Sequence, residues 1–200
     1  MSNKLLEKID NYYSEKISLH GATSKGVDWN GKESHFLRFN ELSRVLPKES
    51  NFSLLDYGCG FGSLLEYLNN LEVSCDYTGF DISDEMIKKA KEYYSSDNNR
   101  FLTSLDAEIK YDYTIANGIF NVKLDTSDKE WKAYIIDTIL KINEFSIKGF
   151  SFNILTSYSD LEYRNADPLF YFDFCKKNIS KNVALLHNYD LYEFTIIVNK

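Results

Sequence analysis

Alternating glycines behind a short apolar run are the feature that most restricts how this 200-residue chain can fold. Gly58, Gly60 and Gly62 follow the segment Leu54-Leu55-Asp56-Tyr57. A glycine-rich turn after a strand lets the backbone reverse sharply and approach a ligand without clashes from Cβ atoms. Asp81 stands 23 residues after Gly58, at the end of the next apolar run, where a carboxylate can accept both hydroxyls of a ribose. The turn and the acid predict a nucleoside site in an α/β fold.

The rest of the chain alternates between strand and helix patterns, which indicates a largely parallel sheet with its ligand at the carboxyl ends of the strands. Strands are predicted at residues 52–55, 74–80, 100–103, 113–116 and 148–155, and a closing antiparallel hairpin at 183–187 and 191–198. Helices are predicted at 5–17, 33–46, 63–71 and 167–175, and behind Ser83 and Ser127. Ser83 is a candidate N-cap, Ser127 and Glu130 form a capping box, and Asp167-Pro168 suits a helix start.

Length and charge exclude several classes of protein. The length suits one domain. A formal charge of −7 with no run of Lys or Arg disfavours nucleic acid as a partner. The amino terminus is polar and no segment has the roughly 18 to 20 apolar residues that cross a bilayer, so we expect a cytoplasmic protein outside the membrane. Cys59, Cys75 and Cys175 lack CxxC spacing, which favours reduced thiols over a disulfide framework or structural zinc.

The pattern Asp56-x-Gly58-x-Gly60-x-Gly62, followed by Gly79-Phe80-Asp81-Ile82-Ser83, resembles the first motif and the second-strand acid of class I S-adenosylmethionine (SAM)-dependent methyltransferases. The resemblance covers about residues 52–200 by element order. It implies a doubly wound, Rossmann-like, mostly parallel seven-stranded sheet with an antiparallel final strand. We expect residues 48–200 to form the SAM-binding methyltransferase domain and residues 1–47 to form an N-terminal helical lid. NAD-binding turns follow the pattern Gly-x-Gly-x-x-Gly/Ala, whereas the residue after Gly62 here is Ser63. This difference disfavours an NAD-dependent oxidoreductase.

The resemblance also implies which residues bind SAM and its product S-adenosylhomocysteine (SAH). Asp56 and the glycine turn would face the methionine part, Asp81 would hold the ribose, and Ile82 would pack on the adenine. Asp106 is a candidate contact for the adenine amine, with a solvated turn acid as the alternative. Arg38 is a candidate for binding the SAM carboxylate or an anionic acceptor. The expected cofactor-binding residues are Asp56, Gly58, Cys59, Gly60, Gly62, Asp81, Ile82, Asp106, Asn117 and Arg38.

The sequence indicates the methyl acceptor less clearly than it indicates the cofactor. The segment from Ala116 to Asn121 occupies the place where these enzymes meet both SAM and acceptor, yet it departs from the Asn-Pro-Pro-aromatic signature of adenine-amine and glutamine-amide methyltransferases. No cluster of Asp and Asn supports the magnesium-dependent catechol type, so we expect no metal. His187 is a candidate general base, with a structural histidine as the alternative. The remaining candidates are Asn121 and Tyr158 for catalysis, and Trp29, His35 and Tyr189 for substrate binding.

These observations predict transfer of the SAM methyl group to oxygen or nitrogen of a small molecule, with an intermediate of carbohydrate assembly or secondary metabolism as the candidate acceptor. We expect a monomer or a homodimer. The alternative is a non-catalytic SAM-binding or scaffold protein that keeps the fold without turnover, because fold and function separate easily.

Overall fold

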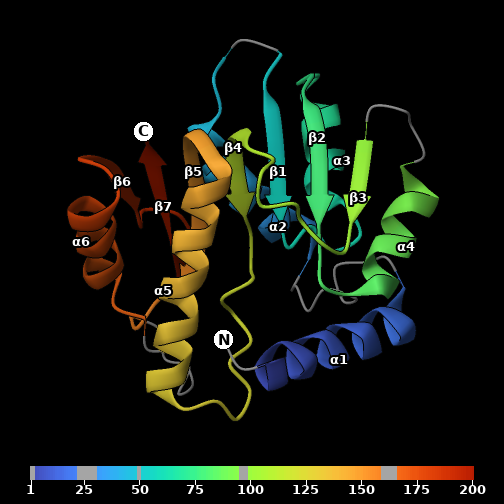
Figure 1. The fold of residues 1–200 in the computed structure, drawn as a ribbon, viewed down its shortest axis with the longest axis horizontal. Helices are drawn as coiled ribbons and strands as arrows, with labels where there is room; N and C mark the ends of the chain where they lie inside the picture. The colour runs from blue at the N-terminus through green and yellow to red at the C-terminus, as the bar shows by residue number, and fades with distance from the viewer. Residues whose placement is uncertain (1–2, 22–30, 49–50, 95–98, 159–165) are drawn as a thin grey trace.

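A seven-stranded sheet with helices on both faces forms the centre of the computed structural model (Figure 1). The structure describes residues 3–21, 31–48, 51–94, 99–158 and 166–200. The strands are β1 (Ser53–Tyr57), β2 (Asp76–Phe80), β3 (Asn99–Leu102), β4 (Tyr111–Ala116), β5 (Ser146–Leu155), β6 (Asn182–Leu186) and β7 (Glu193–Asn199). Their order is β3-β2-β1-β4-β5-β7-β6. β7 is antiparallel to both β5 and β6, and the other neighbouring pairs are parallel. The predicted sheet with an antiparallel final strand is confirmed.

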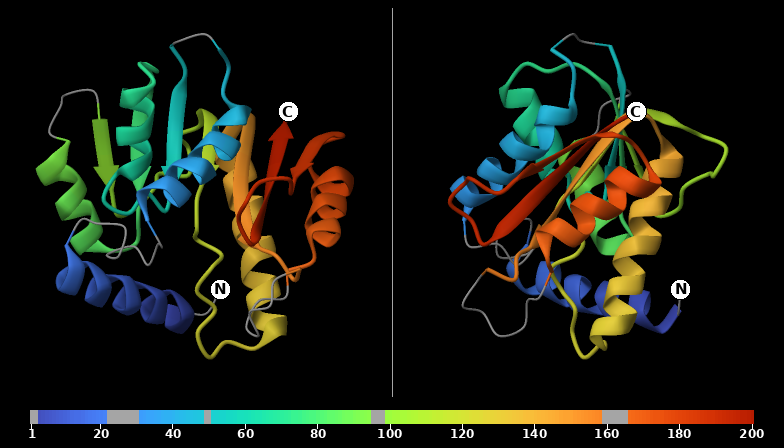
Figure 2. Two further views of the ribbon diagram at one scale, coloured as in Figure 1. Left: turned by 180° about the vertical axis from the view of Figure 1, so that it is seen from behind. Right: turned by 90° about the vertical axis from the view of Figure 1, so that its left-hand side faces the viewer.

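Helices divide between the two faces of the sheet (Figure 2). They are α1 (Asn3–His20), α2 (Lys32–Leu42), α3 (Ser63–Asn70), α4 (Asp84–Tyr93), α5 (Asp128–Phe145) and α6 (Pro168–Asn178). Apolar side chains of α2, α3 and α4 form one core cluster with β1, β2 and β4, whereas α5 and α6 pack with β5 and β7 in a second cluster. Along β5, Phe150, Phe152 and Ile154 belong to the second cluster, while Ser151 bonds to α2 on the opposite face, as the two-residue period of a strand requires.

The predicted helix starts are confirmed at three positions. The Ser83 hydroxyl accepts from the Met86 amide, and Ser127 and Glu130 complete the capping box before α5. Asp167 accepts from the Leu169 amide at 2.9 Å, with Pro168 in the first helical position. These caps satisfy amide groups that have no partner within the helix. The starts of α4, α5 and α6 therefore follow from local side-chain chemistry.

The second helix ends earlier than its apolar pattern suggests. The sequence predicts one helix over residues 33–46, but α2 ends at Leu42 and the tighter 3-10 turn η2 (Ser43–Val45) follows. Leu46 is extended, with φ −76° and ψ 148°. Because Pro47 disfavours helical angles in the residue before it, the chain leaves the helix here and turns toward β1.

α1 lies across the edge of the sheet at which β1, β2 and β3 end (Figures 1 and 2). It packs against α4, and its Ile17 shares a small apolar cluster with Phe61 and with Met86 of that helix. Ser14 Oγ lies 2.9 Å from Ser83 Oγ, and Lys8 Nζ pairs with Asp125 at 2.6 Å near the start of α5. Across the described residues, no helix is both long and apolar enough to cross a membrane.

Candidate functional site

A cavity of about 250 Å³ lies at the carboxyl ends of the central strands. The segments that follow β1, β2 and β4 contribute to its lining, and α1, α2 and α5 contribute further side chains. The lining includes Asp56, Gly58, Cys59, Gly60, Asp81, Ile82, Asn117 and His35, all of which the sequence proposed as site residues. This edge of a parallel sheet is where an open α/β fold binds its ligand.

The turn between β1 and α3 has a shape that glycine permits. Gly58 and Gly60 have φ angles of 85° and 54°, in the region that residues with a Cβ atom rarely adopt. A Cβ atom on Gly58 would lie 2.2 Å from Ile119 Cγ2. The amides of Gly58 and Cys59 both donate to the Phe80 carbonyl, at 2.7 and 2.9 Å. The turn is thereby held against the end of β2, with its backbone at the cavity.

Asp81 joins this turn to the start of α4. Its Oδ2 accepts from the Gly60 amide at 2.9 Å and its Oδ1 accepts from the Ser83 amide at 3.0 Å. Burial raises the pKa of Asp81, and these two backbone hydrogen bonds oppose the rise. Each carboxylate oxygen can accept two hydrogen bonds, so both retain capacity for a further donor. The carboxylate is oriented by the backbone and can accept the two hydroxyls of a ribose.

Asp56 is a second carboxyl group in the lining, and it is only 2% exposed. The Tyr77 hydroxyl donates to its Oδ2 at 2.6 Å. Burial raises the pKa of Asp56 to about 7; the Tyr77 hydrogen bond opposes this rise and the neighbouring charge of Asp81 adds to it. Near neutral pH the Asp56 carboxyl group therefore changes charge, and a cationic ligand group beside it would favour the ionised form.

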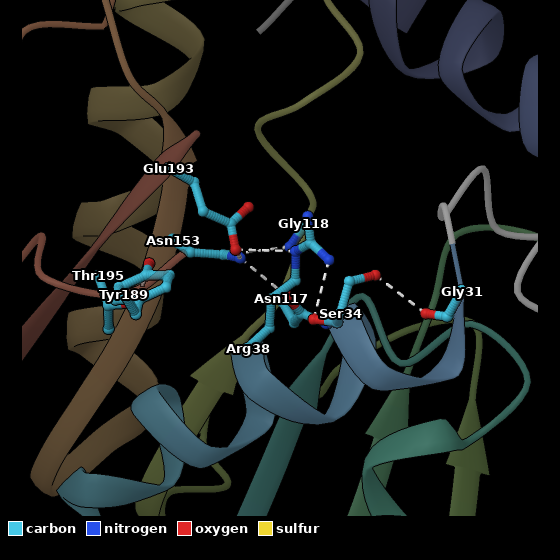
Figure 3. A network of polar contacts seen from close by, with 9 residues as sticks. All are labelled: Gly31, Ser34, Arg38, Asn117, Gly118, Asn153, Tyr189, Glu193 and Thr195. Atoms are coloured by element: carbon cyan, nitrogen blue, oxygen red, sulfur yellow. Dashed lines mark hydrogen bonds and ion pairs between the residues drawn. The ribbon is translucent and has the colours of Figure 1, made fainter. Parts of the chain in front are cut away.

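A polar network reaches the cavity from the α2 side of the sheet (Figure 3). Asn153 of β5 bonds to the Gly118 amide and to the Asn117 side chain, at 2.8 and 2.9 Å. Its Nδ2 also donates to Glu193 Oε1 at 3.2 Å, and Arg38 Nε pairs with the same oxygen at 2.8 Å. Three elements far apart in the chain, α2, β5 and β7, thus form one network with the two residues that follow β4.

His35 brings an imidazole to the lining from α2. It is buried, and its ring centroid lies 4.5 Å from that of Phe39. Burial lowers the pKa of His35 to about 3, and the positive charge of Arg38 acts in the same direction. The imidazole is consequently neutral at physiological pH and only weakly basic, so it can accept a hydrogen bond from a ligand.

Three of the predicted cofactor residues are not among those that line the cavity. Arg38 forms the buried ion pair with Glu193 of β7. Gly62 caps α3 at φ 92°, where an added Cβ would lie 2.9 Å from the Tyr94 ring. Asp106 is exposed and accepts from the Glu108 amide at 3.0 Å, which is the turn-acid alternative.

The predicted catalytic residues lie outside the lining of this cavity as well. His187 and Tyr158 are exposed, with ring centroids 5.8 Å apart. The Tyr189 hydroxyl lies 2.9 Å from Thr195 Oγ1. Asn121 has a buried Oδ1 without a hydrogen-bond partner in the described part of the chain. Trp29 falls outside the described residues. Of the residues proposed for catalysis or substrate binding, the structure brings His35 to the cavity.

Several lining or supporting residues were not expected. Leu6, Ile9 and Tyr13 of α1 line the cavity, together with Tyr134 and Thr138 of α5. Their helical spacing is visible in the sequence, but that spacing indicates only an apolar face and not what the face covers. Tyr77, Asn153 and Glu193 carried no signal, because each sits within a strand pattern and acts through a contact with a distant segment.

Known proteins match both the sequence and the fold. A family model described as "Methyltransferase domain" matches residues 55–143. A Mycobacterium tuberculosis protein named "Putative methyltransferase Rv1506c" is 45% identical over 163 residues, which cover 78% of this chain and 98% of that protein.

Solved structures show the same architecture. Magnesium protoporphyrin IX methyltransferase from Synechocystis PCC 6803 with bound SAH has a TM-score of 0.67 and 14% identity, and the match covers 98% of this chain and 99% of that one. Human N-acetylserotonin methyltransferase in complex with SAM has a TM-score of 0.63 and 16% identity, covering 100% of this chain and 60% of that one. At such identities the likeness shows the fold.

Proposed function

Because this chain belongs to the class I SAM-dependent methyltransferases, we propose that it transfers the methyl group of SAM to an oxygen or nitrogen atom of a small molecule and releases SAH. The observation that carries this proposal is the pairing of Asp81 with the glycine turn, through the 2.9 Å hydrogen bond from the Gly60 amide inside the cavity. That pairing places a carboxylate that can accept further hydrogen bonds beside the backbone of Gly60, which has no Cβ atom.

The lining fits SAM along the strand order. The ribose hydroxyls would bind Asp81 at the end of β2, and the adenine would pack on Ile82. The amino-acid end would then cross the glycine turn toward β1 and β4. Asp56 there suits the ammonium group, since burial without a cation makes its ionised form costly. The two solved neighbours contain SAH and SAM, which supports the same occupant here.

Bound SAM would supply a methyl group on a sulfonium that a lone pair of the acceptor attacks in line, while the carbon–sulfur bond breaks and its electrons remain on sulfur. The chain's own contribution is to position the two reactants and to exclude water. A hydroxyl or protonated nitrogen acceptor must also lose a proton. His35 lines the cavity and is neutral, but a pKa lowered to about 3 makes its imidazole a weak base, so we propose that it accepts a hydrogen bond from the methyl acceptor and does not take up the proton. His187, Asn121 and Tyr158 remain predictions from the sequence.

A small acceptor agrees with the helix that covers the cavity. Leu6, Ile9 and Tyr13 of α1 contribute an apolar side to the lining, which supports the proposed role of residues 1–47 as a lid over the methyltransferase domain at 48–200. A carbohydrate or secondary-metabolite intermediate is the proposed acceptor. We further propose a cytoplasmic monomer or homodimer that acts on neither nucleic acid nor membrane.

Calorimetric titration with SAM, SAH and NAD tests the cofactor. We expect SAM and SAH to bind the wild type, NAD not to bind, and Asp81→Ala to weaken both ligands roughly tenfold or more, since a hydrogen bond to a charged group is lost. Asp81→Asn keeps an oxygen for one of the two backbone donors and guards against a folding defect. Asp76→Ala is the matched control, because Asp76 is an exposed acid at the start of β2, the strand that Asp81 follows, and is paired with Arg100.

The outcomes separate the alternatives. Binding of NAD alone, or of none of the three ligands, would remove the proposed cofactor. SAM binding without methyl transfer to any member of a small-molecule acceptor panel would favour the non-catalytic SAM-binding alternative.

A further inference from the structure

Asn153 occupies a position at which each atom of its amide has a defined partner. It is fully buried in β5. Its Oδ1 faces the Gly118 amide at 2.8 Å, and its Nδ2 faces Asn117 Oδ1 and Glu193 Oε1, at 2.9 and 3.2 Å. No other residue type of this size supplies an acceptor on one side and two donors on the other. The side chain therefore links β5 to the segment behind β4 and to β7.

The orientation of each amide in this network follows from its neighbours. A backbone N–H can only donate, so the Asn153 atom that faces Gly118 must be the oxygen. The Asn153 nitrogen must then be the atom that faces Asn117, and Asn117 must meet it with its own oxygen. The NH₂ group of Asn117 is consequently the end of its amide that does not face Asn153, and within the described residues it has no hydrogen-bond partner. Since Asn117 lines the cavity, its free donor is available to a ligand there.

Glu193 and Arg38 keep this arrangement from reversing. The Glu193 side chain is fully buried; its Oε1 accepts a hydrogen bond from Asn153 Nδ2 and forms an ion pair with Arg38 Nε. Arg38 also donates to the Ser34 carbonyl at 3.0 Å, which ties the guanidinium to α2 (Figure 3). If the Asn153 amide turned over, its oxygen would face the Glu193 oxygen, and a buried repulsion would replace a hydrogen bond.

Strand order indicates which part of a ligand meets Asn117. β1 lies between β2 and β4, and neighbouring strands are about 4.8 Å apart, so Asp81 and Asn117 are separated by roughly two strand spacings. A SAM molecule whose ribose is held by Asp81 would extend its amino-acid end across β1 toward β4. An NH₂ donor at that place matches a carboxylate oxygen.

We propose that Asn153 is a positioning residue that orients the Asn117 amide with its NH₂ group toward the cavity, where it binds the carboxylate of the amino-acid end of SAM or SAH. The inference rests on the proposed function, because it requires that SAM occupy the cavity. It assigns Asn153, Glu193 and Arg38 to the support of Asn117.

Titration with SAH and with 5′-methylthioadenosine, which lacks the amino-acid end, tests the donor at Asn117. Asn117→Asp keeps an oxygen for Asn153 but replaces the cavity-facing donor by an acceptor. We expect it to weaken SAH roughly tenfold or more and to leave 5′-methylthioadenosine within about twofold, because one hydrogen bond to a charged group is exchanged for a repulsion. Equal loss for both ligands, or loss for neither, would overturn the proposal.

Variants at Asn153 separate positioning from folding. Asn153→Asp puts its carboxyl group beside that of Glu193, so we expect a lower melting temperature. The new oxygen also faces Asn117, whose amide should reverse and turn its NH₂ group away from the cavity, so we expect weaker SAH binding. Adding Glu193→Gln restores both a donor and the original net charge of the pair, so stability should return, whereas SAH affinity should remain low because Asn117 still faces an acceptor and stays reversed. Recovery of SAH affinity together with stability would contradict a positioning role.

Ser151→Ala is the matched control for the loss of a buried hydrogen bond. Ser151 is also fully buried in β5 and donates to the Leu42 carbonyl at 2.8 Å, away from the cavity lining. We expect this variant to lose stability without a selective change in SAH binding. A wild type that binds neither SAH nor 5′-methylthioadenosine would refute the proposed function, whereas a wild type that binds both would leave the variants to decide on Asn153.

Discussion

At the scale of single residues, the two carboxyl groups of the cavity differ in their hydrogen-bond partners. Asp81 has two backbone donors at about 3 Å, whereas Asp56 has the Tyr77 hydroxyl at 2.6 Å. Burial raises the pKa of Asp56 from its ordinary value near 3.8 to about 7. The folded protein thus binds this proton more tightly than the unfolded chain does. The contribution of the protonated Asp56 carboxyl group to stability is complete below about pH 4 and is lost as the pH rises through about 7.

Asp56→Asn should remove this pH dependence. The variant keeps an oxygen for Tyr77 and has no charge to form, so its free energy of unfolding should exceed that of the wild type at pH 8, by at most about 4 kcal/mol, and the advantage should shrink toward pH 4. Urea unfolding of the SAM-free protein at both pH values measures the difference. The exposed Asp76→Asn serves as the control, and an equal pH dependence in wild type and Asp56→Asn would show that Asp56 is ionised without penalty.

At the scale of the elements, α1 joins the site mainly through another helix and not through the sheet. It packs on α4, and it is joined to neighbouring segments by the Ser14–Ser83 contact and the Lys8–Asp125 ion pair. Exposed ion pairs contribute little to stability, so the buried side chains of Ile9 and Ile17 hold the helix in place. Because Ile9 also lines the cavity, the docking of α1 and the retention of a ligand should be coupled.

Ile9→Ala should accelerate the release of SAH, in addition to lowering the melting temperature. We expect a dissociation rate roughly three to ten times faster, because a helix that covers a site gates the exit of its ligand. Stopped-flow displacement of SAH gives this rate. Leu19→Ala is the control on the same helix, since Leu19 is 77% exposed and is not part of the lining. Equal rates in the two variants would argue against a lid.

At the scale of the whole molecule, the ligand site draws on strands, turns and helices from most of the chain, so occupancy should stabilise the fold as a unit. Any ligand that binds only the folded state shifts the unfolding equilibrium by mass action. At 100 times its dissociation constant, SAH should add about 2.7 kcal/mol. For a domain of this size that corresponds to a rise of roughly 5 to 10 °C in melting temperature. Calorimetric scans with and without SAH measure the rise. Asp81→Ala, with an affinity about tenfold lower, should show roughly half of it or less at the same SAH concentration.

Much of the architecture was predictable because its causes are local. Strand and helix periods, the caps at Ser83, Ser127 and Asp167, and the glycines of the first turn all depend on residues a few positions apart. Asp81 was predictable as well, because a strand that follows the turn brings its last residue to the same edge of a parallel sheet. The early end of α2 is the local exception, where Pro47 acted against a continuing apolar pattern.

The sequence by itself determined the order of the elements, the glycine turn and the acid that faces it. Only the tertiary structure decided that Arg38 pairs with Glu193, that Tyr77 bonds to Asp56, and that Asn153 reaches Gly118 from 35 residues away. Such contacts depend on which strands become neighbours and in which register. No local pattern encodes the partner of a polar side chain inside a strand, because burial and sheet order are properties of the folded chain as a whole.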